Sequence, residues 1–421
     1  MQAAARSDRI QSTHMPALRL QPPPTPPESG GVGGGCSRGE SANRIRLSDA
    51  ATIAVFLAGI IGFGVLSLAK SPDVQSLARE NRKPAPPPAV PLDYQALKKT
   101  PAQIEQYFND RIAFRESLLR WHAVARFELG ASPTEKVLIG RDGWLFMNEP
   151  KTESNTGRAP SQEMLADAWA ETFRRRGQWL AQRGIQYLVI PAPDKQAIYP
   201  EFMPDGARLT PLPCAGELLG RKLEGDPAVE FIALRPLLQQ AKRERAVYYR
   251  TDTHWNEDGA YVAYRAILER LAKRWPNVKP LDRQAFDEKI EPYVGDLTRM
   301  LRLPEDIPEQ AHFLHPRRPS ARRINREVPL DDRLWSPRHI EPQVWGTGNA
   351  ALPRAVLFHD SFAERLLLPV LAEHFEWLVF CPSESGDPNV IERFHPDLVI
   401  HELVERKINW QKPFSAPGFG Q

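Results

Sequence analysis

Cysteine is scarce in this chain, with three residues among 421: Cys36, Cys214 and Cys381. No two of them form a C-x-x-C pair, so neither a structural zinc site nor a thioredoxin-like redox motif is expected. Cys214 and Cys381 could pair in an oxidising compartment. The sequence leaves that pairing open.

Several ligand-binding motifs are also missing. There is no H-E-x-x-H metal motif, no Walker A loop, and no G-x-G-x-x-G after a predicted strand. The net charge is only +3, from 55 Lys and Arg against 52 Asp and Glu, whereas a nucleic-acid-binding protein normally shows a clustered basic face. We therefore predict no metal, no cofactor and no nucleic-acid partner.

Charge is absent from one long segment, residues 50–69, which reads AATIAVFLAGIIGFGVLSLA. At about 1.5 Å per residue, a helix of this length spans roughly the 30 Å of a bilayer core. It predicts a single transmembrane anchor, with a buried core helix as the alternative. Basic residues flank both ends, so their count does not decide the orientation.

The segments around this anchor have little apolar sequence. Residues 1–49 are rich in Pro, Gly, Ser and Arg and bury too little apolar surface to fold alone, so we predict disorder. Residues 70–99 contain a proline tract and are predicted to be a semi-extended linker. A domain over residues 100–405 follows, and residues 406–421 are predicted to be a C-terminal tail.

Within the domain, apolar runs typical of strands alternate with helical periodicity. Strands are predicted at 187–190, 230–233, 355–358, 376–380 and 397–400, and helices at 161–183, 218–223 and 362–375. Another helix is predicted after Asn256, where apolar residues recur at helical spacing from Tyr261 to Leu271. Two further short strands surround an Asp-Gly turn within 137–146. Residues 276–350 are predicted to form loops or a small insertion. The alternation indicates an α/β fold, a mostly parallel sheet with helices on both faces.

Asp252 and His254 are the first candidate pair. They follow an apolar run at 246–249, and alternating residues of an extended segment point to the same side. A carboxylate so placed can orient an imidazole. Asn256 is a suitable N-cap for the helix that follows. The alternative is a hydrogen-bonded turn without chemistry.

Ser361 is the candidate nucleophile. It follows the strand predicted at 355–358 and comes just before a predicted helix, whose free N–H groups could hold an oxyanion. His254 would act as its general base and Asp252 would orient that base. The alternative is that Ser361 only caps the helix. Asp360 could compete with Asp252 as the orienting acid, but we expect it to cap or brace the turn.

Together these motifs resemble the SGNH hydrolase-like domain of the alginate O-acetyltransferases (the AlgJ/AlgX type) and related DHHW proteins. The matching pieces, in chain order, are 140–146 (GRDGWLF), 193–200 (PDKQAIYP), 252–256 (DTHWN), 295–297 (GDL), 359–362 (HDSF) and 396–400 (PDLVI). One departure is His359, where many SGNH serine blocks carry glycine.

The resemblance implies an SGNH-like (flavodoxin-like) sheet and a Ser361–His254–Asp252 triad. It implies O-acetylation of a polysaccharide acceptor by a protein of the inner membrane whose catalytic domain lies in the periplasm. The implied partner is a multipass membrane O-acyltransferase (MBOAT) that supplies acetyl groups. Four residues are expected to line the substrate cleft: Lys195, Tyr199, Trp255 and Asn256. For Trp255 the alternative is a place in the core, and for Asn256 a helix cap.

Two other functions use the same residues. A carbohydrate acetyl esterase would remove acetyl groups with the same triad. A scaffold of a polysaccharide export or modification complex would have no catalytic activity.

Overall fold

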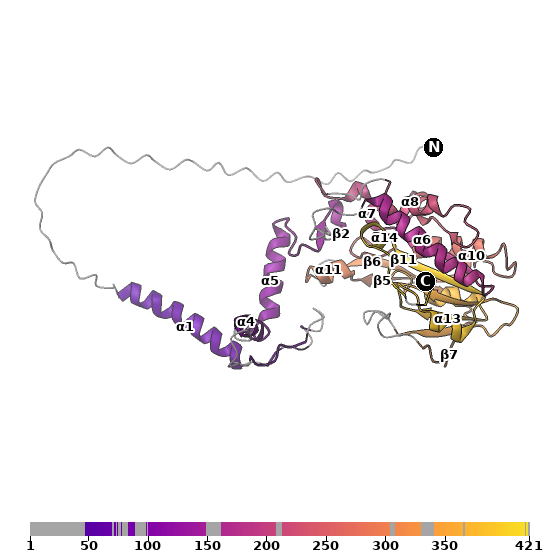
Figure 1. Ribbon diagram of the computed structural model, residues 1–421. Coiled ribbons are helices and arrows are strands. Elements are labelled where there is room, and N and C mark those ends of the chain that lie inside the picture. Colours follow the sequence, from indigo (N-terminus) through magenta and orange to yellow (C-terminus); the bar gives the residue numbers. More distant parts are fainter. Residues whose placement is uncertain are drawn as a thin grey trace, which may run out of the picture. The chain divides into compact units, whose positions relative to one another are not determined.

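The computed structural model (Figure 1) describes 13 stretches of the chain. They are residues 47–69, 71–72, 74, 77, 83–88, 98, 100–148, 161–207, 213–303, 308–329, 341–364, 367–416 and 418–419. The chain divides into two compact units, Met1–Ser71 and Pro72–Gln421. Most of the segment predicted as disordered and much of the predicted linker lie outside the described residues.

The first unit contains one described helix, α1 (Leu47–Ala69). Its stretch Asp49–Ala69 is long and apolar enough to cross a membrane, judged by length and composition. Nearly all of its side chains are exposed to solvent. This helix coincides with the anchor predicted at 50–69.

The second unit is built on a seven-stranded sheet with the order β4-β3-β11-β9-β10-β8-β7. The five strands β4, β3, β11, β9 and β10 are parallel, and β8 and β7 extend the sheet in antiparallel fashion. The bounds are β3 Gln186–Ala192, β4 Glu230–Phe231, β7 Arg322–Ile324, β8 Gln343–Gly346, β9 Arg354–Phe358, β10 Trp377–Cys381 and β11 Leu398–Val404. The predicted mostly parallel sheet is confirmed.

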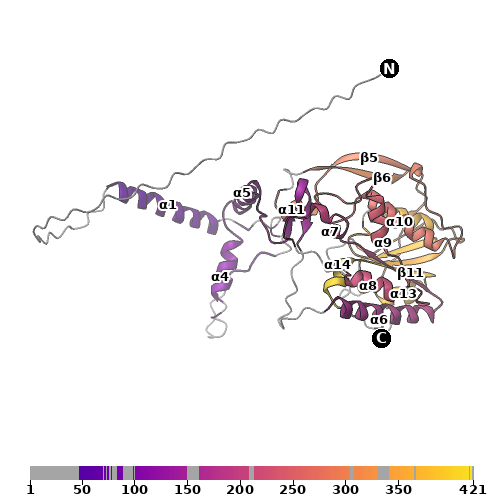
Figure 2. The same ribbon diagram turned by 90° about the horizontal axis from the view of Figure 1, so that it is seen from above.

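Both faces of the sheet are buried, because its strands alternate between two apolar clusters. Leu188 and Ile190 of β3 belong to one cluster, whereas Tyr187 and Val189 belong to the other. Helices α9 (Leu234–Ala241) and α10 (Glu257–Leu271) contribute to the first cluster. The second includes α6 (Gln162–Ala181) and α8 (Ala215–Lys222). Figure 2 shows these two pairs of helices on opposite sides of the strands.

The described residues between 405 and 419 belong to this domain, which corrects the predicted tail at 406–421. Helix α14 (Glu405–Trp410) follows β11 directly. Ile408 and Phe419 are buried in the second apolar cluster, and Arg176 of α6 donates a 2.8 Å hydrogen bond to the Phe414 carbonyl. Their apolar side chains supply part of the core.

Residues 276–350 contain more regular secondary structure than the sequence predicted. Strands β5 (Phe286–Tyr293) and β6 (Glu309–Pro316) pair along eight residues each. Helix α11 (Asp296–Met300) lies between them in the chain. The strand β5 exposes six consecutive residues, so it lacks the apolar alternation that reveals a strand in sequence.

Residues 100–148 precede the sheet. They form helices α4 (Thr100–Asn109) and α5 (Arg115–Glu128) and the hairpin of β1 (Val137–Ile139) and β2 (Leu145–Met147). The hairpin turns at Asp142 and Gly143, both with positive φ. The predicted pair of strands around an Asp-Gly turn is confirmed.

Candidate active site

Ser361 and His254 are in direct contact. Ser361 Oγ lies 2.8 Å from His254 Nε2, within hydrogen-bond range. Ser361 follows β9 and is partly exposed, and the His254 side chain is 12% exposed. The pair is therefore open to solvent on one side while the imidazole is held by protein on the other.

Asp252 holds that other side. Its Oδ1 lies 2.6 Å from His254 Nδ1 and accepts a 2.9 Å hydrogen bond from the His254 backbone N–H. The two residues lie on a bend rather than on an extended strand, because the only pairing nearby is an isolated bridge between Tyr248 and Trp255. The predicted proximity is found, but an Asx-type turn produces it instead of strand alternation.

The second oxygen of Asp252 is held from the insertion after α10. Tyr293 Oη donates to Oδ2, as does the Asp296 backbone N–H at 3.0 Å. Burial acts to raise the pKa of Asp252, but the hydrogen bonds from His254 and Tyr293 outweigh it and hold the pKa well below its usual value. Asp252 is therefore an anion whose four hydrogen bonds fix its orientation.

Asp360 braces the turn that carries Ser361, as the sequence predicted. Its carboxylate accepts hydrogen bonds from the backbone N–H groups of Phe362 (2.9 Å) and Val404 (2.8 Å), and it lies 3.2 Å from Lys407 Nζ. Burial acts to raise the pKa of Asp360, yet the Lys407 cation and these N–H groups lower it below its usual value. The turn after β9 is thus tied to the start of α14.

The helix expected directly after Ser361 is not present there. Residues 361–364 are turns, and α12 begins at Leu367 and ends at Leu371. The Phe362 N–H is already bonded to Asp360. Among the described residues, the prediction that a helix begins at Ser361 is therefore wrong. The free N–H groups that such a helix would offer to an oxyanion are not supplied in this way.

The four residues expected to bind substrate make structural contacts. Trp255 is buried, and its indole N–H donates a 3.0 Å hydrogen bond to the Phe362 carbonyl, which ties the histidine loop to the serine turn. Tyr199 Oη accepts from Val247 N–H at 2.9 Å. Asn256 caps α10 by accepting from Gly259 N–H at 3.0 Å. The predicted caps and core contacts account for these side chains, and their substrate role stays a prediction.

Lys195 lies beneath the loop that carries Asp252 and His254 (the Asp252 loop) instead of facing a cleft. It is 2% exposed, and its Nζ donates to the carbonyls of Asp252 (2.7 Å), Tyr249 (3.1 Å) and Arg250 (3.1 Å). Burial lowers the pKa of Lys195 to about 7. Such a side chain fixes the backbone of the loop, so a substrate role is not supported by its position.

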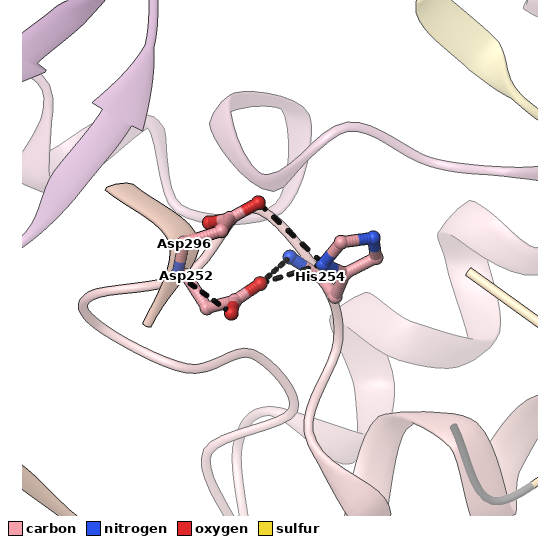
Figure 3. Close-up of side chains that lie close together, drawn as sticks. All are labelled: Asp252, His254 and Asp296. Carbon is pink, nitrogen blue, oxygen red and sulfur yellow. Dashed lines mark hydrogen bonds and ion pairs between the residues drawn. The ribbon is translucent and has the colours of Figure 1, made fainter. Parts of the chain in front are cut away.

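Asp252, His254 and Asp296 form a compact cluster, shown in Figure 3. Their ligand-type atoms lie within 4.8 Å of one another. Those atoms are engaged already: His254 Nδ1 with Asp252, and the Asp296 carboxylate with the N–H (2.8 Å) and hydroxyl (2.6 Å) of Thr253. We therefore interpret the cluster as an acid–imidazole network rather than a metal site.

A cavity of about 880 Å³ lies at the end of β3 and β4, against α8 and α9. Its lining includes Asp194, Arg235 and Glu405 but none of Ser361, His254 and Asp252. Arg406 links the two places, because it pairs with Asp194 at 2.7 Å and lies over the Phe362 ring. The cavity is thus beside the serine turn and separate from it.

Three residues near the site were given no role by the sequence: Tyr293, Asp296 and Glu309. Glu309 of β6 accepts backbone hydrogen bonds from Arg250 (2.9 Å) and Thr251 (3.0 Å). Asp296 stands in the GDL motif, which was a usable signal. Tyr293 and Glu309 lie in a segment without apolar periodicity, so nothing local marks them.

The two cysteines Cys214 and Cys381 are buried and free. The disulfide that the sequence left open is therefore not formed. The Cys214 Sγ instead accepts a hydrogen bond from Arg235 Nη2 at 3.1 Å.

The sheet, its helices and the serine turn define the SGNH hydrolase-like fold. Residues 137–331 match the family model described as "SGNH hydrolase-like domain, acetyltransferase AlgX". The structure of Bacillus cereus PatB1 with a sulfonyl adduct is similar with a TM-score of 0.51 and 16% identity, over 66% of this chain and 98% of that one. At this identity the likeness supports the fold.

Curated relatives are similar in sequence. The "Probable alginate O-acetylase AlgJ" of Pseudomonas fluorescens is 28% identical over 257 residues, which is 59% of this chain and 62% of that protein. The protein of the same name from Pseudomonas aeruginosa is 32% identical over 40% of this chain and 41% of its own length. The matches thus span less than two thirds of these relatives. The resemblance to the AlgJ/AlgX type of SGNH hydrolase-like domain is confirmed.

Proposed function

We propose that this protein is a polysaccharide O-acetyltransferase that works through an acetylated serine. The observation that carries the proposal is the chain of contacts from Ser361 Oγ to His254 Nε2 (2.8 Å) and from His254 Nδ1 to Asp252 Oδ1 (2.6 Å). The similarity to proteins named alginate O-acetylase supports an acetyl group and a polysaccharide. The acceptor is therefore an alginate-like exopolysaccharide.

In the first half-reaction Ser361 Oγ attacks the carbonyl carbon of an acetyl donor. His254 Nε2 takes the hydroxyl proton, and Asp252 stabilises the imidazolium that forms. Collapse of the tetrahedral intermediate breaks the bond to the donor's leaving group, which receives the proton from His254. The products are acetyl-Ser361 and the free leaving group.

In the second half-reaction a sugar hydroxyl attacks acetyl-Ser361. His254 removes the hydroxyl proton and returns it to Ser361 Oγ as the serine ester breaks. The sugar O-acetyl ester leaves and the serine is regenerated. Transfer requires that the sugar hydroxyl reach the ester faster than water does.

The same proposal includes the place of the protein in the cell. Helix α1 would anchor the chain in the inner membrane, and the domain from residue 100 onward would work in the periplasm. A multipass membrane O-acyltransferase would supply the acetyl groups. The support is the apolar length of α1 and the family resemblance. Alkaline phosphatase fused after Gln421 tests the orientation, since it is active in the periplasm and inactive in the cytoplasm.

Purified protein incubated with an acetyl ester, with and without oligosaccharide, tests the reaction. We expect acetate release without acceptor and acetylated sugar with it. Ser361→Ala should abolish both, whereas Ser117→Ala, an exposed serine on α5, should leave both unchanged. Acetate release that never diverts to sugar would favour the esterase. Full polymer acetylation in a Ser361→Ala strain would favour the scaffold.

A further inference from the structure

The insertion of residues 286–316 holds the Asp252 loop from one side. Tyr293, at the end of β5, donates its hydroxyl hydrogen bond to Asp252 Oδ2. Its ring stacks on Tyr249, with centroids 4.4 Å apart. Glu309 of β6 receives the N–H groups of Arg250 and Thr251. The backbone that presents Asp252 and His254 is thus fixed by strands that the catalytic sheet does not contain.

The insertion also brings a second carboxylate to the imidazole. Asp296 Oδ2 lies 3.8 Å from His254 Nδ1, the same ring nitrogen that contacts Asp252 Oδ1 (Figure 3). Both Asp296 oxygens accept hydrogen bonds from Thr253, the residue between Asp252 and His254. Burial, and then the charge of Asp252, raise the pKa of Asp296. The two hydrogen bonds from Thr253 act against this rise, favour the ionised carboxylate and hold it facing the same ring nitrogen.

We infer that Asp296 and Tyr293 are positioning residues that act in opposite directions on the protonated form of His254. The Asp296 carboxylate stabilises the imidazolium through its charge. The Tyr293 hydroxyl withdraws charge from Asp252, so it weakens the stabilisation that Asp252 provides. This inference rests on the proposed function, in which His254 must gain and lose a proton in each half-reaction.

The other charged groups around His254 come from four elements. Lys195 of α7 (Lys195–Ile198) bonds the Asp252 carbonyl, and Glu309 of β6 bonds the loop backbone. Asp360 precedes Ser361 and is paired with Lys407 of α14. Arg406 of α14 lies over Phe362, whose ring centroid is 4.8 Å from that of His254. Among these described groups, only Asp252 and Asp296 reach His254 Nδ1 with an anionic oxygen.

The test is the rate at which a fluorophosphonate labels Ser361 as a function of pH, measured on the full chain in detergent. The rate rises as His254 loses its proton. We expect the midpoint of this rise to move about one unit lower in Asp296→Asn and about one unit higher in Tyr293→Phe. Tyr261→Phe, which loses a hydroxyl that donates to the Leu281 carbonyl, should leave the midpoint in place. A loss of rate without movement of the midpoint in either variant would overturn the inference.

A second readout does not need a reactive serine. The imidazole NMR signals of His254, recorded in a Ser361→Ala background, should titrate with the same two opposite displacements. If wild-type Ser361 is never labelled but these displacements appear, the proposed function fails and the inference about Asp296 and Tyr293 stands. If Ser361 is labelled and the NMR midpoint is the same in all variants, only the inference fails.

Discussion

Ser361 Oγ lies 2.8 Å from His254 Nε2, although 107 residues separate them in the chain. Two loops that share no strand produce this contact. They are joined by the hydrogen bond from the Trp255 indole to the Phe362 carbonyl. The distance between serine and histidine therefore depends on residues one position beyond each of them.

Replacing Asp252 with asparagine tests the orienting acid. The amide removes the charge that stabilises the imidazolium and favours the wrong tautomer of His254, so acetyl-ester turnover should fall on the order of 10⁴-fold. The measurement is kcat on a small acetyl ester. Asp205→Asn alters a carboxylate with a 91% exposed side chain and should have no effect. Turnover within a few fold of wild type in Asp252→Asn would remove Asp252 from the triad.

Gly295→Ala tests how closely the insertion approaches the loop. A Cβ at this position would overlap the Thr251 carbonyl and lie 2.7 Å from the Asp252 amide nitrogen. The loop must then move, and a shift near 1 Å can cost about a hundredfold in rate. We expect kcat to fall by that order. The control is Gly220→Ala, whose Cβ would lie 3.0 Å from the Phe231 ring edge and which should retain activity. Equal losses of kcat in the two variants would point to general destabilisation instead.

Lys195→Met tests the buried amine. Three carbonyls lose their donor, so the free energy of unfolding should fall by about 3 kcal/mol. The pKa of Lys195 is near 7 in the folded chain against a usual 10.5. Between pH 7 and pH 10.5, Lys195 is therefore protonated in the unfolded chain but mostly neutral in the folded chain. The stability of wild type should therefore rise from pH 7 to pH 10 relative to Lys195→Met. Urea unfolding at several pH values measures both, and parallel pH profiles would contradict the low pKa.

His401 should make the fold sensitive to acid. Burial lowers its pKa to about 3 from a usual 6.5, and it holds hydrogen bonds to Tyr187 Oη (2.9 Å) and to the Glu384 carbonyl (2.8 Å). As the pH falls, His401 gains a proton in the unfolded chain before it does so in the folded chain. The protein therefore has its full stability above pH 6.5 and loses stability as the pH falls toward 3. The loss should approach about 1.4 kcal/mol per pH unit.

The matched variant is His401→Gln. It should be less stable at pH 7 but should lose less further stability between pH 6.5 and pH 4, as measured by urea unfolding. His315→Gln, an exposed histidine on β6, should follow wild type. A slope in His401→Gln equal to that of wild type would show that another group causes the acid sensitivity.

The sequence alone determined the five parallel strands of the sheet and the residues to examine, but not the antiparallel strands β7 and β8. Strand β3 and the first half of β11 contain the apolar runs 187–190 and 398–400, because both faces of these strands are buried. The α10 helix and its Asn256 cap were readable from local spacing. The motifs also singled out Asp252, His254 and Ser361 before any distance was known.

Only the tertiary structure decided what surrounds these three residues. It replaced the helix expected after Ser361 with a turn braced by Asp360, and it placed Lys195 under the loop. It also brought Tyr293 and Asp296 to the Asp252–His254 pair. Such contacts join residues dozens to hundreds of positions apart, and they depend on how whole elements pack. Local apolar periodicity carries no information about them.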